Sequence, residues 1–298
     1  MKTYKPLDMM KPLALAVALA LLGGCAGPGP RIDHSYSSSS HSSRVRFIVL
    51  HYTVGDLADS LKTLTQQEVS SHYLLTDEPA PRVFGLVDEA RQAGHAGVSS
   101  WKTYTHINNS SVGIEIVNPG YRDTPEGRVW QPYTPAQIEQ LIALLRQIGA
   151  RHGIKPENIL GHSDIAPQRK LDPGPLFPWQ QLAQAGLAQW PDAARVASRR
   201  PAYEGRVPAI AWFQKRLGMH GFAVPDSGAL DLATRNVMIA FQMKYRPAKY
   251  DGEPDAESAA ILDVLTSPPP MPWAVDAVVL PSCGEGGEAL PACVNKAP

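Results

Sequence analysis

The chain has little cysteine, no net charge and no apolar run long enough to cross a membrane. Only 3 of its 298 residues are cysteine, and 28 basic side chains balance 28 acidic ones. A balanced chain has no general attraction for polyanions, so we expect no nucleic-acid partner and no binding to an anionic membrane surface. Hydrophobic residues make up 44% of the chain, which allows a sizeable core and favours two domains over one.

The N-terminus has the pattern of a processing signal. Lysines precede an apolar run over residues 12–22, which is too short to span a bilayer, and "LGGC" then ends at Cys25. That tetrapeptide resembles a bacterial lipobox, and Ala26, by resemblance to Gram-negative lipoproteins, favours the outer membrane. We therefore expect residues 1–24 to be a lipoprotein signal peptide and Cys25 to carry a lipid anchor facing the periplasm. A simple secretory signal with an incidental cysteine is the alternative.

Two segments contain too few apolar residues for a packed core. Residues 25–43 are rich in Gly, Pro and Ser and are expected to form a flexible tether. Residues 267–298 form a Pro- and Gly-rich tail that contains Cys283 and Cys293. In an oxidising compartment these two cysteines could close a local disulfide, although free thiols are the alternative. No histidine lies near them in sequence, so we expect no catalysis by cysteine.

Residues 44–196 combine strand and helix patterns. The continuous apolar run over residues 47–50 suits a strand that is covered on both faces. Thr134 and Gln137 form a capping box at the start of the clearest helix, which should stop at Gly153. Strands that alternate with helices indicate an α/β layer architecture. The other predicted elements are a helix at about 57–64 and strands near 70–77, 82–89 and 111–118.

Residues 205–266 contain three short helical patterns. The first begins near Ile210 and should end at Gly218, and the other two follow Asp231 and Asp255, each an acceptable N-cap. A stretch rich in Arg, Ser and Pro at about 197–204 precedes them and is expected to be a linker. The sequence therefore predicts a second, small three-helix domain.

A loop rich in Pro and Gly carries the most unusual chemistry. The sequence "GHSDIAPQRKLDPGPLF", residues 161–177, holds His162 and Asp172 ten positions apart. His51 stands at the end of the buried strand predicted above. A hydrolytic zinc ion takes three protein ligands of these types and keeps a fourth position open for water. Taken singly, however, a histidine that ends a strand is more readily explained as a structural residue.

Five segments in one order identify a family. They are "FIVLHYT", "SSHYLL", "GHAGVSSW", "NNSSVGIEIVN" and "GHSDIAPQRKLDPGPLFPW". The series resembles the zinc-dependent type-2 N-acetylmuramoyl-L-alanine amidases, related to peptidoglycan recognition proteins, and is most similar to their periplasmic outer-membrane lipoprotein members. The resemblance covers residues 44 to about 192. It implies a mixed central sheet flanked by helices, peptidoglycan and muropeptides as partners, and cleavage of the amide between N-acetylmuramic acid, or its anhydro form, and L-alanine in cell-wall turnover or recycling.

The same resemblance assigns roles within the site. It implies one Zn²⁺ held by His51, His162 and Asp172, with Glu115 as the general base and Lys170 stabilising the oxyanion. An amide carbonyl is a poor electrophile, which is why such a site needs both a Lewis acid and a base. Without the resemblance, Glu115 could be a structural strand carboxylate and Lys170 a solvated loop residue.

Several neighbouring residues allow two interpretations. Tyr52 and Thr53 adjoin a predicted ligand and could contact substrate or support the ligand. His95 could make structural hydrogen bonds or contact substrate. We interpret Asp164 as a cap of the turn rather than a metal ligand, and Arg169 as a solvated side chain.

The C-terminal helical part carries a second resemblance. The segments "FQKRLGMHGF", "GALDLATRNVMIAFQMKY" and "DGEPDAESAAIL" resemble a peptidoglycan-binding domain. Two alternatives to the amidase stay open: a noncatalytic lipoprotein that binds or senses peptidoglycan, and a peptidase of the same fold that cuts another amide. We expect a monomer, since no long apolar repeat indicates a coiled coil, although composition leaves the oligomeric state open.

Overall fold

The computed structural model describes residues 30–267. Every described helix and strand belongs to one compact unit that begins at Ser43, and the described residues before it contain neither. Among residues 30–267, no helix has both the length and the apolar character that a membrane span requires. The predicted lipidation site Cys25 and the predicted disulfide between Cys283 and Cys293 lie outside the described residues.

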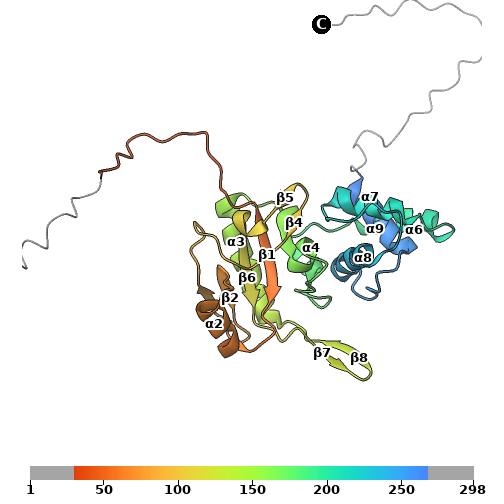
Figure 1. The fold of residues 1–298 in the computed structure, drawn as a ribbon, viewed down its shortest axis with the longest axis horizontal. Coiled ribbons are helices and arrows are strands. Elements are labelled where there is room, and N and C mark those ends of the chain that lie inside the picture. The colour runs from red at the N-terminus through yellow and green to blue at the C-terminus, as the bar shows by residue number, and fades with distance from the viewer. Residues whose placement is uncertain (1–29, 268–298) are drawn as a thin grey trace, which may run out of the picture. The chain divides into compact units, whose positions relative to one another are not determined.

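A five-stranded mixed sheet forms the centre of the first half of the unit (Figure 1). Its strand order is β3-β2-β6-β1-β9, in which β3 is antiparallel to β2 and the other neighbours are parallel. The predicted α/β fold with a mixed sheet is therefore confirmed. The strands are β1 (Phe47–Tyr52), β2 (Tyr73–Leu75), β3 (Val83–Gly85), β6 (Ser111–Ile116) and β9 (Ile159–Gly161).

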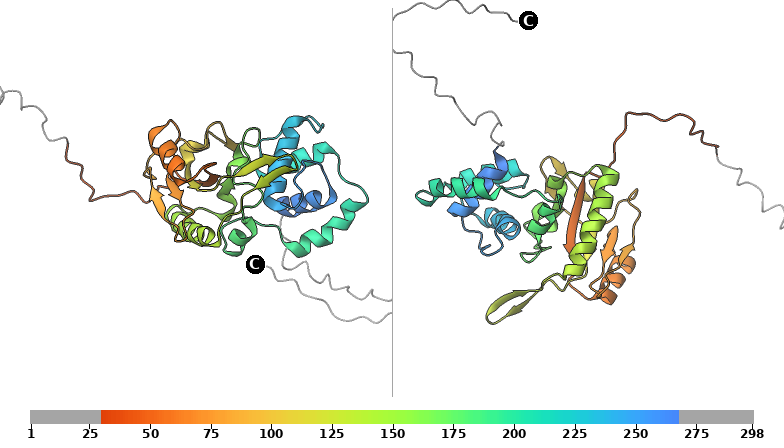
Figure 2. Two further views of the ribbon diagram at one scale, coloured as in Figure 1. Left: turned by 90° about the horizontal axis from the view of Figure 1, so that it is seen from below. Right: turned by 180° about the vertical axis from the view of Figure 1, so that it is seen from behind.

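The long helix α3 (Pro135–His152) begins and ends where the sequence predicts. The Thr134 side chain accepts a hydrogen bond from the Gln137 backbone, and the Gln137 side chain accepts one from the Thr134 backbone, which completes the capping box. Gly153 follows the last turn in the left-handed conformation, with φ at 67°. The right-hand view of Figure 2 shows α3 lying across one face of the sheet.

Strand β1 is covered on both faces, as its apolar run predicts. Side chains alternate along a strand, so Ile48 and Leu50 pack in the cluster that contains α3. Phe47 and Val49 point the other way and pack in a second cluster. His51 belongs to this second series, and its side chain therefore leaves the sheet on the face away from α3.

Short elements complete this half. The predicted helix α2 (Leu57–Gln66) is present, with Asp56 as its N-cap. Two hairpins and two short helices were not predicted, because none spans enough residues to show a clear period. They are the hairpin of β4 (Ser100–Trp101) and β5 (Tyr104–Thr105), the hairpin of β7 (Tyr121–Thr124) and β8 (Gly127–Trp130), α4 (His162–Ile165) and α5 (Trp179–Gln184).

The three predicted C-terminal helices are present. Asp231 and Asp255 cap the second and third, each accepting a hydrogen bond from a backbone N–H of the first turn. The first continues past Gly218, where we expected it to stop, and ends at His220. These helices are α7 (Ile210–His220), α8 (Leu232–Tyr245) and α9 (Ala256–Thr266).

The segment at 197–204, predicted as a linker, is instead part of a fourth helix, α6 (Ala193–Glu204). Contacts with residues distant in sequence stabilise this helix. Val196 packs against the cluster that α8 and α9 build, and Arg199 donates a 2.6 Å hydrogen bond to Asp263, a buried residue of α9. The linker interpretation was wrong because the polar composition of the segment reflects one exposed helix face rather than an absence of structure.

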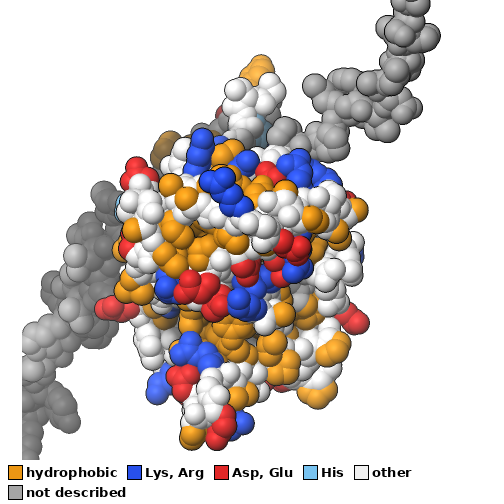
Figure 3. All heavy atoms as spheres, turned by 90° about the vertical axis from the view of Figure 1, so that its right-hand side faces the viewer, with side chains coloured by type: hydrophobic (Ala, Val, Ile, Leu, Met, Phe, Trp, Pro, Cys, Tyr) orange, Lys and Arg blue, Asp and Glu red, His pale blue; other side chains and the backbone are white. Residues whose placement is uncertain are grey.

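The sheet and the helical part share one hydrophobic cluster. Trp101, almost fully buried, lies with its ring centroid 5.7 Å from that of His220 and 5.1 Å from that of Phe222. The same cluster includes β1 side chains and residues of α7, α8 and α9. On the outer face, which Figure 3 shows, acidic and basic side chains are interspersed rather than separated by sign. The shared cluster shows that apolar packing joins the helical part to the sheet.

Candidate active site

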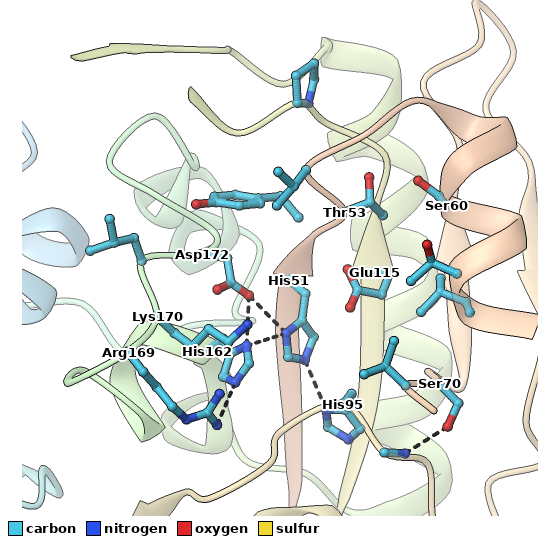
Figure 4. A pocket seen from close by; sticks show the side chains of 18 of the residues that line it. His51, Thr53, Ser60, Ser70, His95, Glu115, His162, Arg169, Lys170 and Asp172 are labelled. Carbon is cyan, nitrogen blue, oxygen red and sulfur yellow. Dashed lines mark hydrogen bonds and ion pairs between the residues drawn. The ribbon is translucent and has the colours of Figure 1, made fainter. Parts of the chain in front are cut away.

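The structure brings together three residues from distant parts of the chain. His51 is the last residue but one of β1, His162 begins α4, and Asp172 follows on the next loop (Figure 4). The Nδ1 atoms of the two histidines are 2.9 Å apart, and each lies 3.0 Å from Oδ2 of Asp172. All three are buried, and within residues 30–267 they are the one group of three such side chains arranged to hold a metal ion.

The outer nitrogen of each imidazole has a partner of its own. Nε2 of His51 lies 3.0 Å from Nδ1 of His95, and Nε2 of His162 lies 3.2 Å from the carbonyl oxygen of Ala96. Nε2 of His162 is also 3.3 Å from Nη2 of Arg169, but the Ala96 carbonyl is nearer and can only accept, so the His162 proton is assigned to Nε2, and the network favours the same tautomer for His51. Both Nδ1 lone pairs then point at the space that they share with the Asp172 carboxylate. Three converging lone pairs are a site for a cation.

The pKa shifts of His51 and Asp172 also favour a cation site. Burial lowers the pKa of His51 to about 4, and the neighbouring His162 contributes in the same direction. Burial alone would raise the pKa of Asp172, but the two adjacent imidazoles hold it well below its usual range. At neutral pH the cluster therefore presents neutral His51 and an ionised carboxylate, which are the forms that bind metal.

His95 lies beside His51, on the side away from Asp172, and also lines the cavity described below. It is buried between Nε2 of His51 and the hydroxyl of Ser111, which is 3.1 Å from its Nε2 and donates onward to the Ile107 carbonyl at 2.7 Å. Gly113 makes room for this ring, because a Cβ there would lie 2.4 Å from His95. These contacts fit the structural alternative for His95. A glycine inside a strand is a sequence signal for such a close approach.

Glu115 faces the same pocket as the three-residue cluster. It pairs with His51 in the parallel register of β6 and β1, so both side chains leave the sheet on one face. Its Oε2 atom is buried without a hydrogen-bond partner among the residues that the structure describes. Burial, reinforced by the charge of Asp172, raises the pKa of Glu115 well above 4.5. A strand carboxylate held this way is poised to accept a proton, which a salt-bridged one would not do.

The remaining predicted residues line the cavity, which has a volume of about 520 Å³. Lys170 lies on its wall, and its positive charge opposes the effect of burial on Glu115. Tyr52 and Thr53 lie at its edge next to the end of β1. The Thr53 hydroxyl donates to the Gly55 carbonyl at 3.1 Å, which fixes the chain as it leaves the strand.

Asp164, on α4, and Arg169, on the loop after it, have contacts that bear on their predicted roles. Asp164 caps the turn as expected, since its Oδ2 accepts a 2.8 Å hydrogen bond from the Gly161 backbone. Arg169 is exposed, as expected of a solvated side chain, but it also donates to the carbonyls of Ala96 and Val98. The sequence did not predict these contacts because the loop at 96–98, far away in sequence, supplies the acceptors. Arg169 thereby holds the carbonyl that orients His162.

Comparison with known proteins assigns the family. Residues 41–175 match the family described as N-acetylmuramoyl-L-alanine amidase. Over 265 residues the chain is 43% identical to the N-acetylmuramoyl-L-alanine amidase AmiD of Escherichia coli (strain K12), covering 84% of this chain and 95% of that relative. This chain belongs to the N-acetylmuramoyl-L-alanine amidases. It is therefore an enzyme rather than the noncatalytic binding protein that the sequence also allowed.

Two solved structures agree with this amidase over most of the chain. The complex of E. coli AmiD with the substrate anhydro-N-acetylmuramic acid-L-Ala-D-γ-Glu-L-Lys superposes with a TM-score of 0.73 and 43% identity, covering 80% of this chain and 94% of that one. AmpDh3 from Pseudomonas aeruginosa in complex with anhydromuramic pentapeptide gives a TM-score of 0.73 and 39% identity, covering 78% and 96%. The family match ends at residue 175, whereas the two superpositions cover 80% and 78% of this chain. The structural likeness therefore extends beyond the part of the chain that forms the sheet.

Proposed function

We propose that this amidase uses one zinc ion, held by His51, His162 and Asp172, to cleave the amide between N-acetylmuramic acid and L-alanine. The observation that carries the proposal is the convergence of three metal-binding lone pairs beside an unpartnered buried carboxylate, Glu115. The donor set of two imidazoles and one carboxylate is one that catalytic zinc uses. Zinc–ligand bonds of about 2.0–2.1 Å in a tetrahedron separate ligand atoms by about 3.3 Å. The observed separations of 2.9–3.0 Å are within a few tenths of an ångström of that value.

The side chains around the site supply the remaining chemistry. When bound, zinc would acidify a water molecule and polarise the substrate carbonyl. Glu115 takes the proton of the attacking water and returns it to the departing amine of L-alanine, a role worth roughly 10²- to 10⁴-fold in rate. Lys170 places a positive charge on the wall of the same cavity, where it stabilises the negative charge that develops on the carbonyl oxygen. Tyr52 and Thr53 contact the substrate at the rim of the cavity.

The substrate includes the anhydro form of muramic acid. The two similar structures described above hold anhydromuramyl peptides, and this chain covers more than nine tenths of each of them. The amidase would thus act on intact wall and on the anhydromuropeptides that wall turnover releases. The helical part at 205–266 would bind peptidoglycan and hold the enzyme, as a monomer, at its polymer.

The N-terminal segment would place the enzyme in the periplasm. Cleavage of residues 1–24 leaves Cys25 to be lipidated, and residues 25–43 act as a tether from the outer membrane. A Cys25→Ser variant should then move from the outer-membrane fraction to the soluble periplasmic fraction. Retention of this variant in the outer membrane would contradict the anchor.

Mass spectrometry of the products tests the reaction and the cofactor together. Purified enzyme is incubated with intact peptidoglycan and with anhydromuropeptides, with and without a chelator, and then with Zn²⁺ restored. Free stem peptide should appear only in the samples that contain metal. Products cut at another amide would contradict the assigned bond, and undiminished activity in the chelator would contradict the zinc centre.

A further inference from the structure

A buried ion pair links the helical part to the turn that begins with His162. Nζ of Lys244, on α8, lies 2.6 Å from Oδ2 of Asp164, and the two side chains are only 6% and 1% exposed. The same oxygen accepts the hydrogen bond of the Gly161 backbone that caps α4. The ammonium also lies 4.0 Å from the ring centroid of Trp179. Both charges are therefore desolvated, and each depends on the other.

Further contacts join the same two segments. Ile165, the last residue of α4, and its C-cap Ala166 pack in the hydrophobic cluster that α8 helps to build. The Gln168 side chain donates to the Ala233 carbonyl at 2.9 Å and accepts from the Asn236 side chain at 3.0 Å. The first part of the chain between the two proposed ligands of this segment, residues 164–168, thus packs on α8.

We infer that α8 positions the metal-binding segment and that Lys244 is a positioning residue of the active site. Asp164 lies half a turn after His162 on one short helix, and the Ser163 backbone donates to the Asp172 carbonyl at 2.8 Å. A shift of α4 therefore moves both ligands relative to His51, which stays fixed in the sheet. This inference rests on the proposed metal centre. It makes the helical part a component of the catalytic site as well as a wall-binding part.

The test compares zinc affinity with folding stability in the full chain. The variants are Lys244→Met, which removes the charge but keeps a long apolar side chain, and the double variant Lys244→Met with Asp164→Asn. Lys249→Met is the matched control, because Lys249 is on the same helical part but 58% exposed, in a surface ion pair with Asp251. Zinc dissociation constants are measured by competition with a chromophoric chelator, and urea unfolding is followed on the metal-free proteins.

Lys244→Met should weaken zinc binding 10- to 100-fold, the usual effect of removing support behind a ligand, while Lys249→Met leaves it unchanged. The double variant has no unpaired buried charge, so its stability should return toward wild type while its zinc affinity stays weak. Wild-type zinc affinity in the double variant would overturn the inference, and so would wild-type affinity in Lys244→Met. If Lys244→Met does not fold, the double variant decides alone. Failure of the wild-type chain to bind zinc would instead refute the proposed function.

Discussion

Replacing Glu115 by glutamine should make this amidase nearly inactive and slightly more stable. Loss of the general base should lower kcat by 10²- to 10⁴-fold, which is about 3–5.5 kcal/mol of barrier. The buried, unpartnered Oε2 atom costs the folded protein free energy, and such groups cost about 1–3 kcal/mol. Glutamine keeps the shape and removes the charge but still has polar atoms to satisfy. We therefore expect a gain near the lower end, about 1 kcal/mol.

The stability difference between Glu115→Gln and wild type should depend on pH. Burial raises the pKa of Glu115 in the folded protein above 4.5, so the folded state keeps a proton that the unfolded state releases as the pH rises past 4.5. The wild type therefore loses stability relative to Glu115→Gln with increasing pH. Urea unfolding should be measured from pH 4 to 8 on metal-free protein, because a bound dication would favour the ionised carboxylate.

An exposed glutamate of α3 provides the control. Glu139→Gln removes the same charge from the surface and should change neither the rate nor the unfolding free energy by more than a few tenths of a kcal/mol. The reasoning would be refuted if Glu115→Gln kept full activity. It would also be refuted if the stability advantage of this variant shrank as the pH rose, since Glu115 would then be stabilised in its ionised form.

Three other substitutions test separate parts of the account. Asp172→Ala leaves two ligands, so zinc retained after dialysis and hydrolytic activity should both be lost, and full activity would contradict the ligand assignment. Lys170→Met should lower kcat about 10²- to 10³-fold with little change in KM, whereas a raised KM alone would assign Lys170 to substrate binding. Burial lowers the pKa of His220 from 6.5 to about 3, so its contribution to stability is complete above pH 6.5 and is lost as the pH falls toward 3. Between these limits, the unfolding free energy of His220→Gln, measured with urea, should change with pH by up to about 1.4 kcal/mol per pH unit less than that of wild type. An unchanged pH slope would contradict the buried neutral form. The exposed His106→Asn is the control.

Elements with a strong local period could be predicted from the sequence. The apolar run of β1 and the capping box and apolar stripe of α3 each specify a structure within a few residues, and both are present. By contrast, α6 contains three arginines and a proline at position 201, and it is helical because Asp192 caps it and α9 covers one face. Such stabilisation comes from residues distant in sequence, which no local pattern contains.

The active site also depends on contacts between residues that are distant in sequence. His51 and His162 are 111 positions apart, so no spacing rule could bring them together, and only the family resemblance predicted their meeting. The groups that orient His162 could not be identified in this way. The Ala96 carbonyl contacts the imidazole, and the Arg169 side chain donates to that carbonyl. Every residue has a backbone carbonyl, so no sequence pattern marks this contact. The pairing of Lys244 with Asp164 depends on how α8 packs against the sheet, and it became visible only in three dimensions.

X-ray diffraction from crystals grown with zinc, recorded on both sides of the zinc absorption edge, would locate the proposed ion. We expect a single anomalous peak about 2.0–2.2 Å from Nδ1 of His51, Nδ1 of His162 and the carboxylate of Asp172, with Glu115 close by but not coordinated. An ion bound elsewhere, or one bound without Asp172, would contradict it.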